Sequence, residues 1–415
     1  MPSLRLVSAC LAAALFQSTA IAAEEEPAQL PEGPPKAFIE QNCVACHALD
    51  RITNARYNPT DWANALDRMV SVGAPVTPDM VPELLAYLTE HFPEEPRPAP
   101  VLIDGPAQVT FDEYKVNAPG TAPWDVQPMD DGSIWYTGEY GNLVGHYDPA
   151  TGQKEEYRVR VPVSQPRNMT VDADGYIWFT ANFRSYVGKL DPATGQHEIF
   201  YAQNREEAHD PFAIVRAEDG TMWVSYQNTN FIGRLAPGET VFDTFELPTL
   251  RSRPYSLAFD PGGDLWFGSN GTNMLGQIDT ETLEVTEHRL PGDNARPRSI
   301  MIAPDGDIYY TDSGRHALGR FDPETGTWSE WPTPSGEGGT PWGLAWFKGK
   351  VWFTEANVSP NALVRFDPST EEFSSWAIPG RGEDVRNIEV TADGEGLVLP
   401  ESGVNLLAVV HVTEP

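Results

Sequence analysis

Residues 166–180 read PRNMTVDADGYIWFT, and this stretch decides the fold because the chain repeats it. A short apolar run follows the proline, an Asp-Gly pair comes next, and an aromatic run ends in Trp-Phe-Thr. Asp-Gly between two runs of strand character is a strong β-hairpin signal. The stretch therefore predicts two neighbouring strands that a tight turn connects.

Six further copies of this hairpin occur along the chain. They are PWDVQPMDDGSIWYT, PFAIVRAEDGTMWVS, PYSLAFDPGGDLWFG, PRSIMIAPDGDIYYT, PWGLAWFKGKVWFTE and the more divergent VRNIEVTADGEGLVLP. Their anchor residues recur every 43 to 45 positions, at Trp135, Trp178, Trp223, Trp266, Tyr309, Trp352 and Leu397. A fixed period in this range indicates a solenoid or a propeller with one supersecondary unit per repeat.

In each repeat, the residues after the hairpin are expected to form two more strands. A third strand such as YVGKLD is followed by a turn such as PATGQ and by a fourth strand such as KEEYRV. Four strands per unit and seven units predict an all-β seven-bladed propeller over residues 107–415. The last copy stops at its third strand, and the segment near 108–117 resembles a fourth strand. We expect that segment to close the last blade and to leave no open edge.

The region before the propeller has a different character. Residues 1–23 carry one arginine, an apolar run and small residues at the end, which is typical of a cleaved signal peptide. Residues 30–98 show helical spacing of apolar side chains, and residues 99–106 form a proline-rich linker. The prediction is a protein of the periplasm or a secreted protein, with a small all-α N-terminal domain before the propeller.

The helical region contains the pentapeptide C-x-x-C-H, formed by Cys43, Cys46 and His47. A C-x-x-C pair alone fits a redox dithiol, half of a zinc site or a haem attachment site. The histidine directly after the second cysteine favours haem, and the chain has no second C-x-x-C for zinc. We therefore expect one haem c, bonded to Cys43 and Cys46, with His47 as an axial ligand of a cytochrome c domain.

The sixth ligand of this iron is less determined by the pattern. Met69 lies on the apolar face of one expected helix, and Met80 lies near the start of the next. Thioether ligation raises the haem potential and suits electron transfer. Met69 is the first candidate and Met80 the alternative, while His91 or an open position would also complete the site. For any of these methionines, core packing is the competing interpretation.

Composition excludes several classes of partner. The formal net charge is −32, with 60 acidic and 28 basic residues. Such a charge argues against nucleic acid and against anionic membranes as partners. No apolar stretch after the signal is long enough to span a bilayer, so we do not expect an integral membrane protein. A redox partner protein and a small-molecule ligand remain as candidate partners.

Candidate ligand-binding residues follow the two conserved landmarks of each copy. Residues just after the proline begin the innermost strand, and residues just after Trp-Phe-Thr end the second strand; both open onto one face of a propeller. The first group is Trp124, Asp125, Arg167, Asn168, Phe212, Tyr255, Arg298, Trp342, Arg386 and Asn387. The second group is Asn182, Asn270, Asp312, Glu355 and Glu401, with His209 just before its copy. Guanidinium groups bind carboxylates as a fork, so the arginines predict an anionic or flat ligand. The alternative is that these side chains pair with one another or with channel water.

Two carboxylates of the second group, Asp312 and Glu355, are also candidates to bind a divalent cation. The chain contains no P-loop, nucleophile motif or zinc motif. The catalytic residues are therefore unknown at this point.

The blade pattern resembles the streptogramin (virginiamycin B) lyase family, most clearly in DGYIWFTANFRSYVGKLDPATG and VWFTEANVSPNALVRFDPST. The resemblance implies a magnesium-dependent lyase that opens a lactone by elimination. In that family a glutamate follows Trp-Phe-Thr and a histidine two residues later is the general base. Glu355 matches the glutamate, but Asn357 stands at the position of the histidine. The corresponding residues of the other copies are Tyr140, Phe183, Asn228, Gly271, Gly314 and Ser402.

The N-terminal region, from CVACHALDRITNARYNPTDWANALDRMVSVGAP, resembles class I c-type cytochromes and haem domains that serve periplasmic dehydrogenases. Three hypotheses follow. The first is a haem protein for electron transfer, with a propeller that binds or oxidises an unidentified substrate. The second is a magnesium-dependent C–O lyase, which the absent histidines disfavour. The third is a propeller that only docks a redox partner, and salt-sensitive binding to a basic protein would favour it.

Overall fold

A computed structural model describes residues 29–43, 49–53, 55–71, 74–118, 120–380 and 384–414 of the 415-residue chain. The chain divides into two compact units, Met1–Ala55 and Arg56–Pro415. Within the described ranges, none of the helices has both the length and the apolar character needed to cross a membrane.

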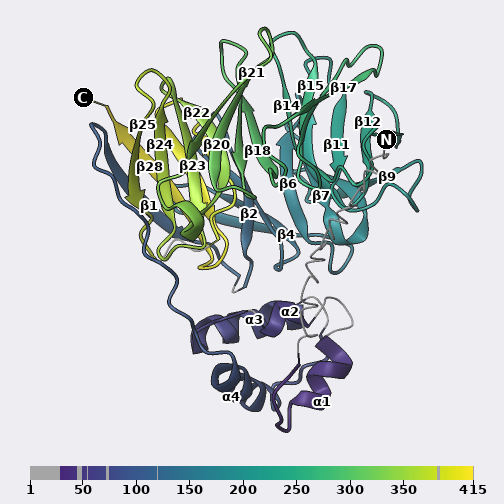
Figure 1. The fold of residues 1–415 in the computed structure, drawn as a ribbon. Helices are drawn as coiled ribbons and strands as arrows, with labels where there is room; N and C mark the ends of the chain where they lie inside the picture. The colour runs from purple at the N-terminus through teal and green to yellow at the C-terminus, as the bar shows by residue number, and fades with distance from the viewer. Residues whose placement is uncertain are drawn as a thin grey trace, which may run out of the picture. The chain divides into compact units, whose positions relative to one another are not determined.

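The helices are short and all lie before the strands (Figure 1). The first unit holds α1 (Lys36–Phe38), the π-helical turn η1 (Ile39–Cys43) and α2 (Asp50–Thr53). The second unit begins with α3 (Pro59–Ser71) and α4 (Val81–His91). Asn58 caps α3, because its side-chain oxygen accepts a hydrogen bond from the backbone N–H of Asp61 at 2.9 Å. The indole of Trp62 on α3 donates to the carbonyl of Phe92 after α4 at 3.0 Å, which joins the two helices.

The rest of the second unit is a propeller-like array of four-stranded antiparallel sheets, as the repeat predicts. Four of them follow the chain order: β2 (Pro123–Pro128), β3 (Ile134–Gly138), β4 (Leu143–Tyr147), β5 (Lys154–Arg158); β14 (Pro254–Phe259), β15 (Leu265–Ser269), β16 (Met274–Ile278), β17 (Val285–Arg289); β18 (Pro297–Ile302), β19 (Ile308–Asp312), β20 (Ala317–Asp322), β21 (Thr327–Pro332); and β22 (Thr340–Phe347), β23 (Lys350–Ala356), β24 (Ala362–Asp367), β25 (Glu372–Ala377). Three-residue 3-10 turns, η2 (Asn182–Arg184) and η3 (Gly336–Gly338), lie in connections.

One sheet has eight strands: β6 (Pro166–Val171), β7 (Ile177–Ala181), β8 (Tyr186–Leu190), β9 (His197–Ala202), β10 (Pro211–Arg216), β11 (Met222–Tyr226), β12 (Phe231–Leu235) and β13 (Val241–Glu246). Its strand order is β10-β11-β12-β13-β9-β8-β7-β6, so two runs of four meet at their outer strands. The β13–β9 pairing is parallel and covers only two residue pairs.

The last sheet joins the two ends of the strand-forming region. Its order is β1-β28-β27-β26, with β1 (Gln108–Lys115), β26 (Glu389–Val390), β27 (Gly396–Glu401) and β28 (Leu406–Thr413). Strand β1, from the segment near 108–117, pairs antiparallel with β28 over eight residue pairs. The preceding linker is held against the sheets, since the backbone of Ser375 donates to the carbonyl of Ile103 at 2.9 Å.

The repeated anchors form the core between sheets, as the sequence predicts. Trp223, Trp266 and Trp352 are at most 2% exposed. The glycine of the third strand makes room for the aromatic ring of the second: a Cβ on Gly188 or Gly276 would collide with the facing phenylalanine ring. Removing a buried aromatic side chain typically costs about 3–5 kcal/mol, so each of these anchors contributes substantially to the stability of the fold.

The innermost strands position the site. β2, β6, β10, β14, β18, β22 and β26 each contact the next in this order, and β26 contacts β2, so the series closes on itself. Residues at equal places on these strands therefore converge on one central cavity.

Candidate functional site

The residue after the repeat proline occupies the start of each innermost strand. These residues are Trp124, Arg167, Phe212, Tyr255, Arg298, Trp342 and, in the segment before β26, Arg386. Each contacts the next around the series, and Arg386 contacts Trp124. Guanidinium carbon to ring centroid distances are 4.6 Å (Arg167–Trp124), 5.6 Å (Arg167–Phe212), 5.6 Å (Arg298–Tyr255), 4.1 Å (Arg298–Trp342), 5.2 Å (Arg386–Trp342) and 4.5 Å (Arg386–Trp124); the Phe212 and Tyr255 centroids lie 4.3 Å apart. We call these seven side chains the Arg/aromatic ring.

The Arg/aromatic ring is held by cation–π contacts and a few polar bonds. A guanidinium near an aromatic face is attracted by the quadrupole of the ring. The indole N–H of Trp342 donates to the hydroxyl of Tyr255 at 3.3 Å, across the ring. Arg167 donates to Glu139 at 2.9 Å, and the Glu139 side chain is only 2% exposed. Glu139, which directly follows β3, is a residue that the sequence analysis missed.

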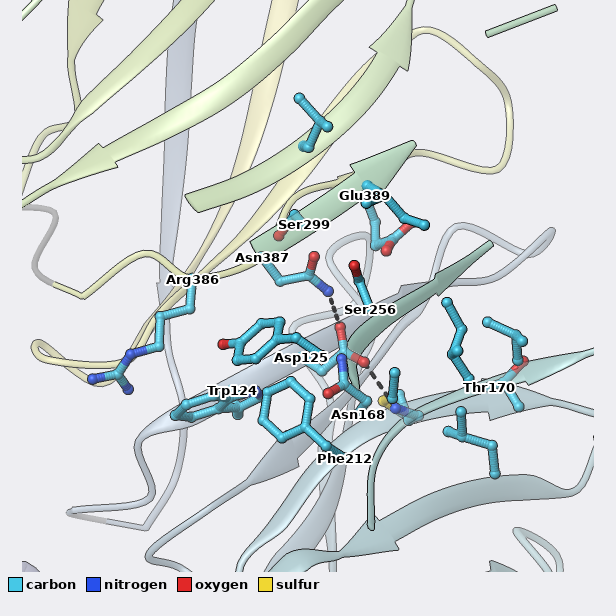
Figure 2. Close-up of a pocket in the computed structure, with 18 of the residues that line it drawn as sticks. Trp124, Asp125, Asn168, Thr170, Phe212, Ser256, Ser299, Arg386, Asn387 and Glu389 are labelled. Atoms are coloured by element: carbon cyan, nitrogen blue, oxygen red, sulfur yellow. Dashed lines mark hydrogen bonds between the residues drawn. The ribbon is translucent and has the colours of Figure 1, made fainter. Parts of the chain in front are cut away.

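Next to Trp124 and Phe212, Asp125 connects β2 to β6 and to the segment before β26 (Figure 2). Its side chain is buried, and its oxygens accept backbone N–H bonds from Val126 at 2.9 Å and Met169 at 2.8 Å. The side-chain amide of Asn387 donates to the same carboxylate. Asn168 lies beside it in the close-up. Asp125, Asn168 and Asn387, all predicted candidates, are thus brought together.

A second carboxylate, Glu389, lines the same cavity and was also missed. Side chains alternate along a strand, so Asn387 and Glu389 share a face; this period of two was the signal that could have identified Glu389. Burial raises the pKa of Glu389 to about 8, and the nearby charge of Asp125 acts in the same direction. Burial raises the pKa of Asp125 to about 6, against the hydrogen bonds that favour its charge. Near neutral pH the pair can therefore hold or exchange a proton.

The cavity has a volume of about 270 Å³ and a mixed, largely polar lining. Besides the two carboxylates and two amides just described, its polar residues include Gln127, Thr170, Ser256 and Ser299. Its main apolar residues are Phe212, Ile214, Leu257, Ile300 and Leu344. Its size is near the lower end of the usual range for small-molecule pockets.

The second group of predicted residues does not line this cavity. Each of its carboxylates pairs with the residue that directly precedes a member of the Arg/aromatic ring: Asp312 with Pro297, Glu355 with Pro341 and Glu401 with Val385. Glu355 accepts from the hydroxyl of Ser335 at 2.6 Å and Asp312 from Arg315 at 2.7 Å. The two carboxylates thus have separate partners, and among the described residues no cluster of three or more His, Cys, Asp or Glu could hold a metal.

The remaining residues of the second predicted group, Asn182, His209 and Asn270, also lie outside the cavity. Asn182 donates its side-chain amide to the carbonyl of Pro211 at 3.1 Å. His209 is 43% exposed and lies 3.1 Å from the carboxylate of Asp210. The Asn270 amide nitrogen is buried and has no hydrogen-bond partner among the described residues. These three residues do not share a partner among the described residues.

Strand register corrects the alignment of the last repeat by one residue. Ala345 pairs with the anchor Trp352, and the equivalent Glu389 pairs with Val398. Val398, not Leu397, is therefore the last anchor. Glu401 is accordingly the equivalent of Glu355, and the position two residues later is Gly403 rather than Ser402. The divergent copy has no aromatic residue to mark the register, which explains the error.

The predicted haem residues are only partly described. Cys43 is the last residue of η1 and is partly exposed, whereas Cys46 and His47 lie outside the described residues. Met69 lies on α3, Met80 directly precedes α4, and both are partly buried. His91 ends α4 with its ring 4.5 Å from the ring of Tyr87.

The position of the family's catalytic histidine is occupied by Asn357, whose amide donates to the hydroxyl of Thr340 at 2.8 Å. Asn357 adopts a positive φ of 65°, in the left-handed region that asparagine tolerates better than most residues. Its side chain is thus used to hold the chain next to β22.

Comparisons with known proteins agree with this fold. A virginiamycin B lyase from Staphylococcus aureus is 23% identical with a TM-score of 0.67, and the match covers 73% of this chain and 99% of that one. A catalytically inactive His-to-Ala variant of that lyase, solved with quinupristin, is 22% identical with a TM-score of 0.66 over 73% and 99% of the two chains. Kuenenia stuttgartiensis hydrazine synthase is 16% identical with a TM-score of 0.61 over 71% and 97%.

A comparison with curated proteins finds no match. At these identities the structural matches establish the fold alone. The profile of the Virginiamycin B lyase family, however, matches residues 109–404, which is most of the chain. The chain belongs to the Virginiamycin B lyase family.

Proposed function

We propose that this chain binds a small molecule in its central cavity and passes electrons from it to a covalently attached haem. The observation that carries the first part is the cavity that members of the Arg/aromatic ring line together with two carboxyl groups of raised pKa. Titratable groups with perturbed pKa values that line a cavity are typical of functional sites. The second part rests on the C-x-x-C-H pentapeptide.

The haem would be bonded to Cys43 and Cys46, with His47 as one axial ligand and Met69, or in its place Met80, as the other. When bound, it would supply one-electron transfer. In the N-terminal region, residues 30–98 would form the cytochrome c domain. The signal peptide of residues 1–23 supports export to the periplasm, where a redox partner protein would take up the electrons.

The propeller in this proposal has seven blades. The closed series of innermost strands supports this number. Five sheets have four strands each, and the eight-stranded sheet would contribute two blades that touch only through β9 and β13. Closure by β1 would then complete the ring.

Oxidation of an organic ligand releases protons together with electrons. In the proposal, the Asp125 carboxylate accepts a proton and shares it with Glu389. The electrons would pass one at a time to a haem held by Cys43, Cys46 and His47, and the partner protein would reoxidise it between transfers.

The test uses the full-length oxidised protein. A pyridine haemochrome spectrum should show thioether-bonded haem, and Cys43→Ser with Cys46→Ser should abolish it. Fractionated periplasmic metabolites are then added while haem reduction is followed by absorbance. We expect one fraction to reduce the haem, and we expect Glu389→Gln to slow that reduction. Equal rates in the variant would refute oxidation in the cavity, and no covalent haem would refute electron transfer.

A magnesium-dependent lyase is the second candidate, because the chain belongs to the Virginiamycin B lyase family. A related lyase is inactive when a histidine is changed to alanine, and here Asn357 stands where the resemblance places the catalytic histidine. We therefore expect no opening of quinupristin with magnesium. Magnesium-dependent ring opening, detected by mass spectrometry, would make the lyase the leading function. Salt-sensitive binding to a basic protein without haem reduction would favour a docking propeller.

A further inference from the structure

The Arg/aromatic ring holds more positive charge than the described carboxylates neutralise. Arg167 has Glu139 at 2.9 Å, and Arg386 has Asp384 at 3.4 Å. Within the described ranges, no carboxylate oxygen lies within 4.0 Å of the Arg298 guanidinium. In a chain with a net charge of −32, such an uncompensated cation is unexpected.

The hydrogen-bonding groups of these arginines are also incompletely used. The Nε atoms of Arg298 and Arg386 are shielded from solvent and meet no acceptor among the described residues. Burial lowers the pKa of Arg298, and the nearby charge of Arg386 acts in the same direction. The charge of Arg298 is thus opposed both by burial and by Arg386, and no described carboxylate offsets this.

The aromatic contacts do not compensate for this arrangement. A cation–π contact contributes about 0.5–2 kcal/mol, whereas removing a charge from water costs several kcal/mol. Buried charges are therefore normally paired. Arg298 and Arg386 are the two neighbours of Trp342 in the ring, with guanidinium carbons 4.1 and 5.2 Å from its ring centroid. Each has an Nε without a described acceptor, so the positive charges of both would attract an anionic group bound at the ring.

We propose that Arg298 and Arg386 bind the carboxylate of a planar organic anion, which is the ligand of the cavity. A planar carboxylate matches the fork of a guanidinium and can lie along an aromatic face. Tyr255 and Arg386 belong to the ring and also line the cavity, so one ligand can contact both. This inference rests on the proposed function and specifies its ligand class.

The test is a calorimetric titration of the full-length protein with benzoate, with the neutral benzamide and with sulfate. We expect benzoate to bind at least about 10-fold more tightly than benzamide, because charge-assisted hydrogen bonds distinguish them. Tighter binding of sulfate than of benzoate would overturn the planar carboxylate. Arg298→Gln should weaken benzoate binding about 10- to 100-fold. Arg298→Lys should restore part of it, because the charge returns without the fork.

The matched control is Arg234→Gln, which removes an exposed arginine that pairs with Asp243 on an outer part of the propeller. It should leave benzoate binding unchanged. Circular dichroism and the unfolding midpoint show whether each variant is folded. Equal binding of benzoate and benzamide, unchanged binding in both Arg298 variants, or no benzoate binding at millimolar concentration would overturn the proposal.

Calorimetry detects ligand binding without any redox reaction. Its result therefore distinguishes failure of the anion site from failure of electron transfer to the haem. If the protein binds benzoate but no metabolite reduces its haem, the anion site stands and the proposed electron transfer fails. If metabolites reduce the haem of Arg298→Gln at the same rate as in the wild type, electron transfer stands and the anion site is refuted.

Discussion

Arg298 lies on β18 and Arg315 lies in the connection between β19 and β20 of the same four strands, and the two carry the same charge in opposite surroundings. Arg315 donates to Asp312 at 2.7 Å and to Glu330 at 3.0 Å. Burial opposes its charge, but the hydrogen bonds to Glu330 and Asp312 outweigh burial and raise its pKa. The Arg298 guanidinium lies near the rings of Tyr255 and Trp342 and has no carboxylate partner among the described residues. Burial lowers its pKa, and the like charge of Arg386 acts in the same direction.

The difference separates charge that holds the fold from charge that is available to a ligand. Arg315 neutralises the fully buried Asp312, so the fold depends on it. Arg298 neutralises no described carboxylate, so its removal should affect ligand binding rather than folding. The following predictions test this contrast, from the largest expected effect to the smallest.

Arg315→Gln should be strongly destabilising. The change leaves the buried Asp312 carboxylate without its cation, and breaking a buried ion pair costs about 3–5 kcal/mol. Because the Arg315 side chain is 25% exposed, we expect the lower end of that range. Urea unfolding followed by tryptophan fluorescence measures it. If Arg315→Gln and Arg298→Gln unfold at the same urea concentration, the contrast is broken.

Glu401→Gln should remove a pH-dependent loss of stability. Burial raises the pKa of Glu401 to about 8, and the charge of Glu113 adds to it. Between about pH 4.5 and 8, the native state therefore still holds a proton on Glu401 that the unfolded chain has already released. Over this window the wild type should lose up to about 1.4 kcal/mol per pH unit relative to the variant.

Unfolding midpoints measured at several pH values check the Glu401 prediction. Glu113→Gln is the informative companion, because it should lower the pKa of Glu401 and make the loss smaller. A wild type and a Glu401→Gln variant with parallel pH profiles would show that Glu401 is compensated by groups not described.

Glu389→Gln should also remove a loss of stability with rising pH, and this loss should be smaller than the one due to Glu401. Its folded-state pKa is raised to about 8, so the wild type should again lose stability as the pH rises towards 8. Glu389 lines the cavity and is more exposed than Glu401, so solvent screening reduces the effect. The pH dependence of the melting temperature measures it, and a more negative slope in the variant than in the wild type would contradict the prediction.

Arg298→Gln should change the free energy of unfolding least, by about 0.5 kcal/mol or less in either direction. It removes a cation–π contact but also relieves the repulsion from Arg386. The same urea experiment measures it. A loss as large as that expected for Arg315 would mean that Arg298 supports the fold through a group outside the described residues.

The sequence predicted which residues belong to the site better than it predicted which of them contact one another. All seven residues of the Arg/aromatic ring follow from one position in the repeat, because equal positions on the innermost strands converge. Glu139 was overlooked although it stands where Asn182 and Asn270 stand in their copies, and Glu389 was missed because it lies three positions after the ring position. Asn387 and Asp125 are 262 positions apart, and their hydrogen bond could not be read from either local pattern.

The two cysteines and the histidine of the pentapeptide illustrate the opposite case. Their haem assignment rests on local spacing alone, and it stays a prediction because Cys46 and His47 lie outside the described residues. Glu355 is intermediate: its place at the end of β23 followed from the sequence, but its bond to Ser335 did not.

By itself, the sequence determined the all-β repeat, the period of its anchors and the residues that open each innermost strand. These features are local, because hairpin turns and the alternation of side chains depend on neighbouring residues. Only the tertiary structure decided which charges are compensated. Arg315 finds its carboxylates close by in the chain, at Asp312 and Glu330. The neighbours of the Arg298 guanidinium, by contrast, come from other innermost strands that the closed series brings together.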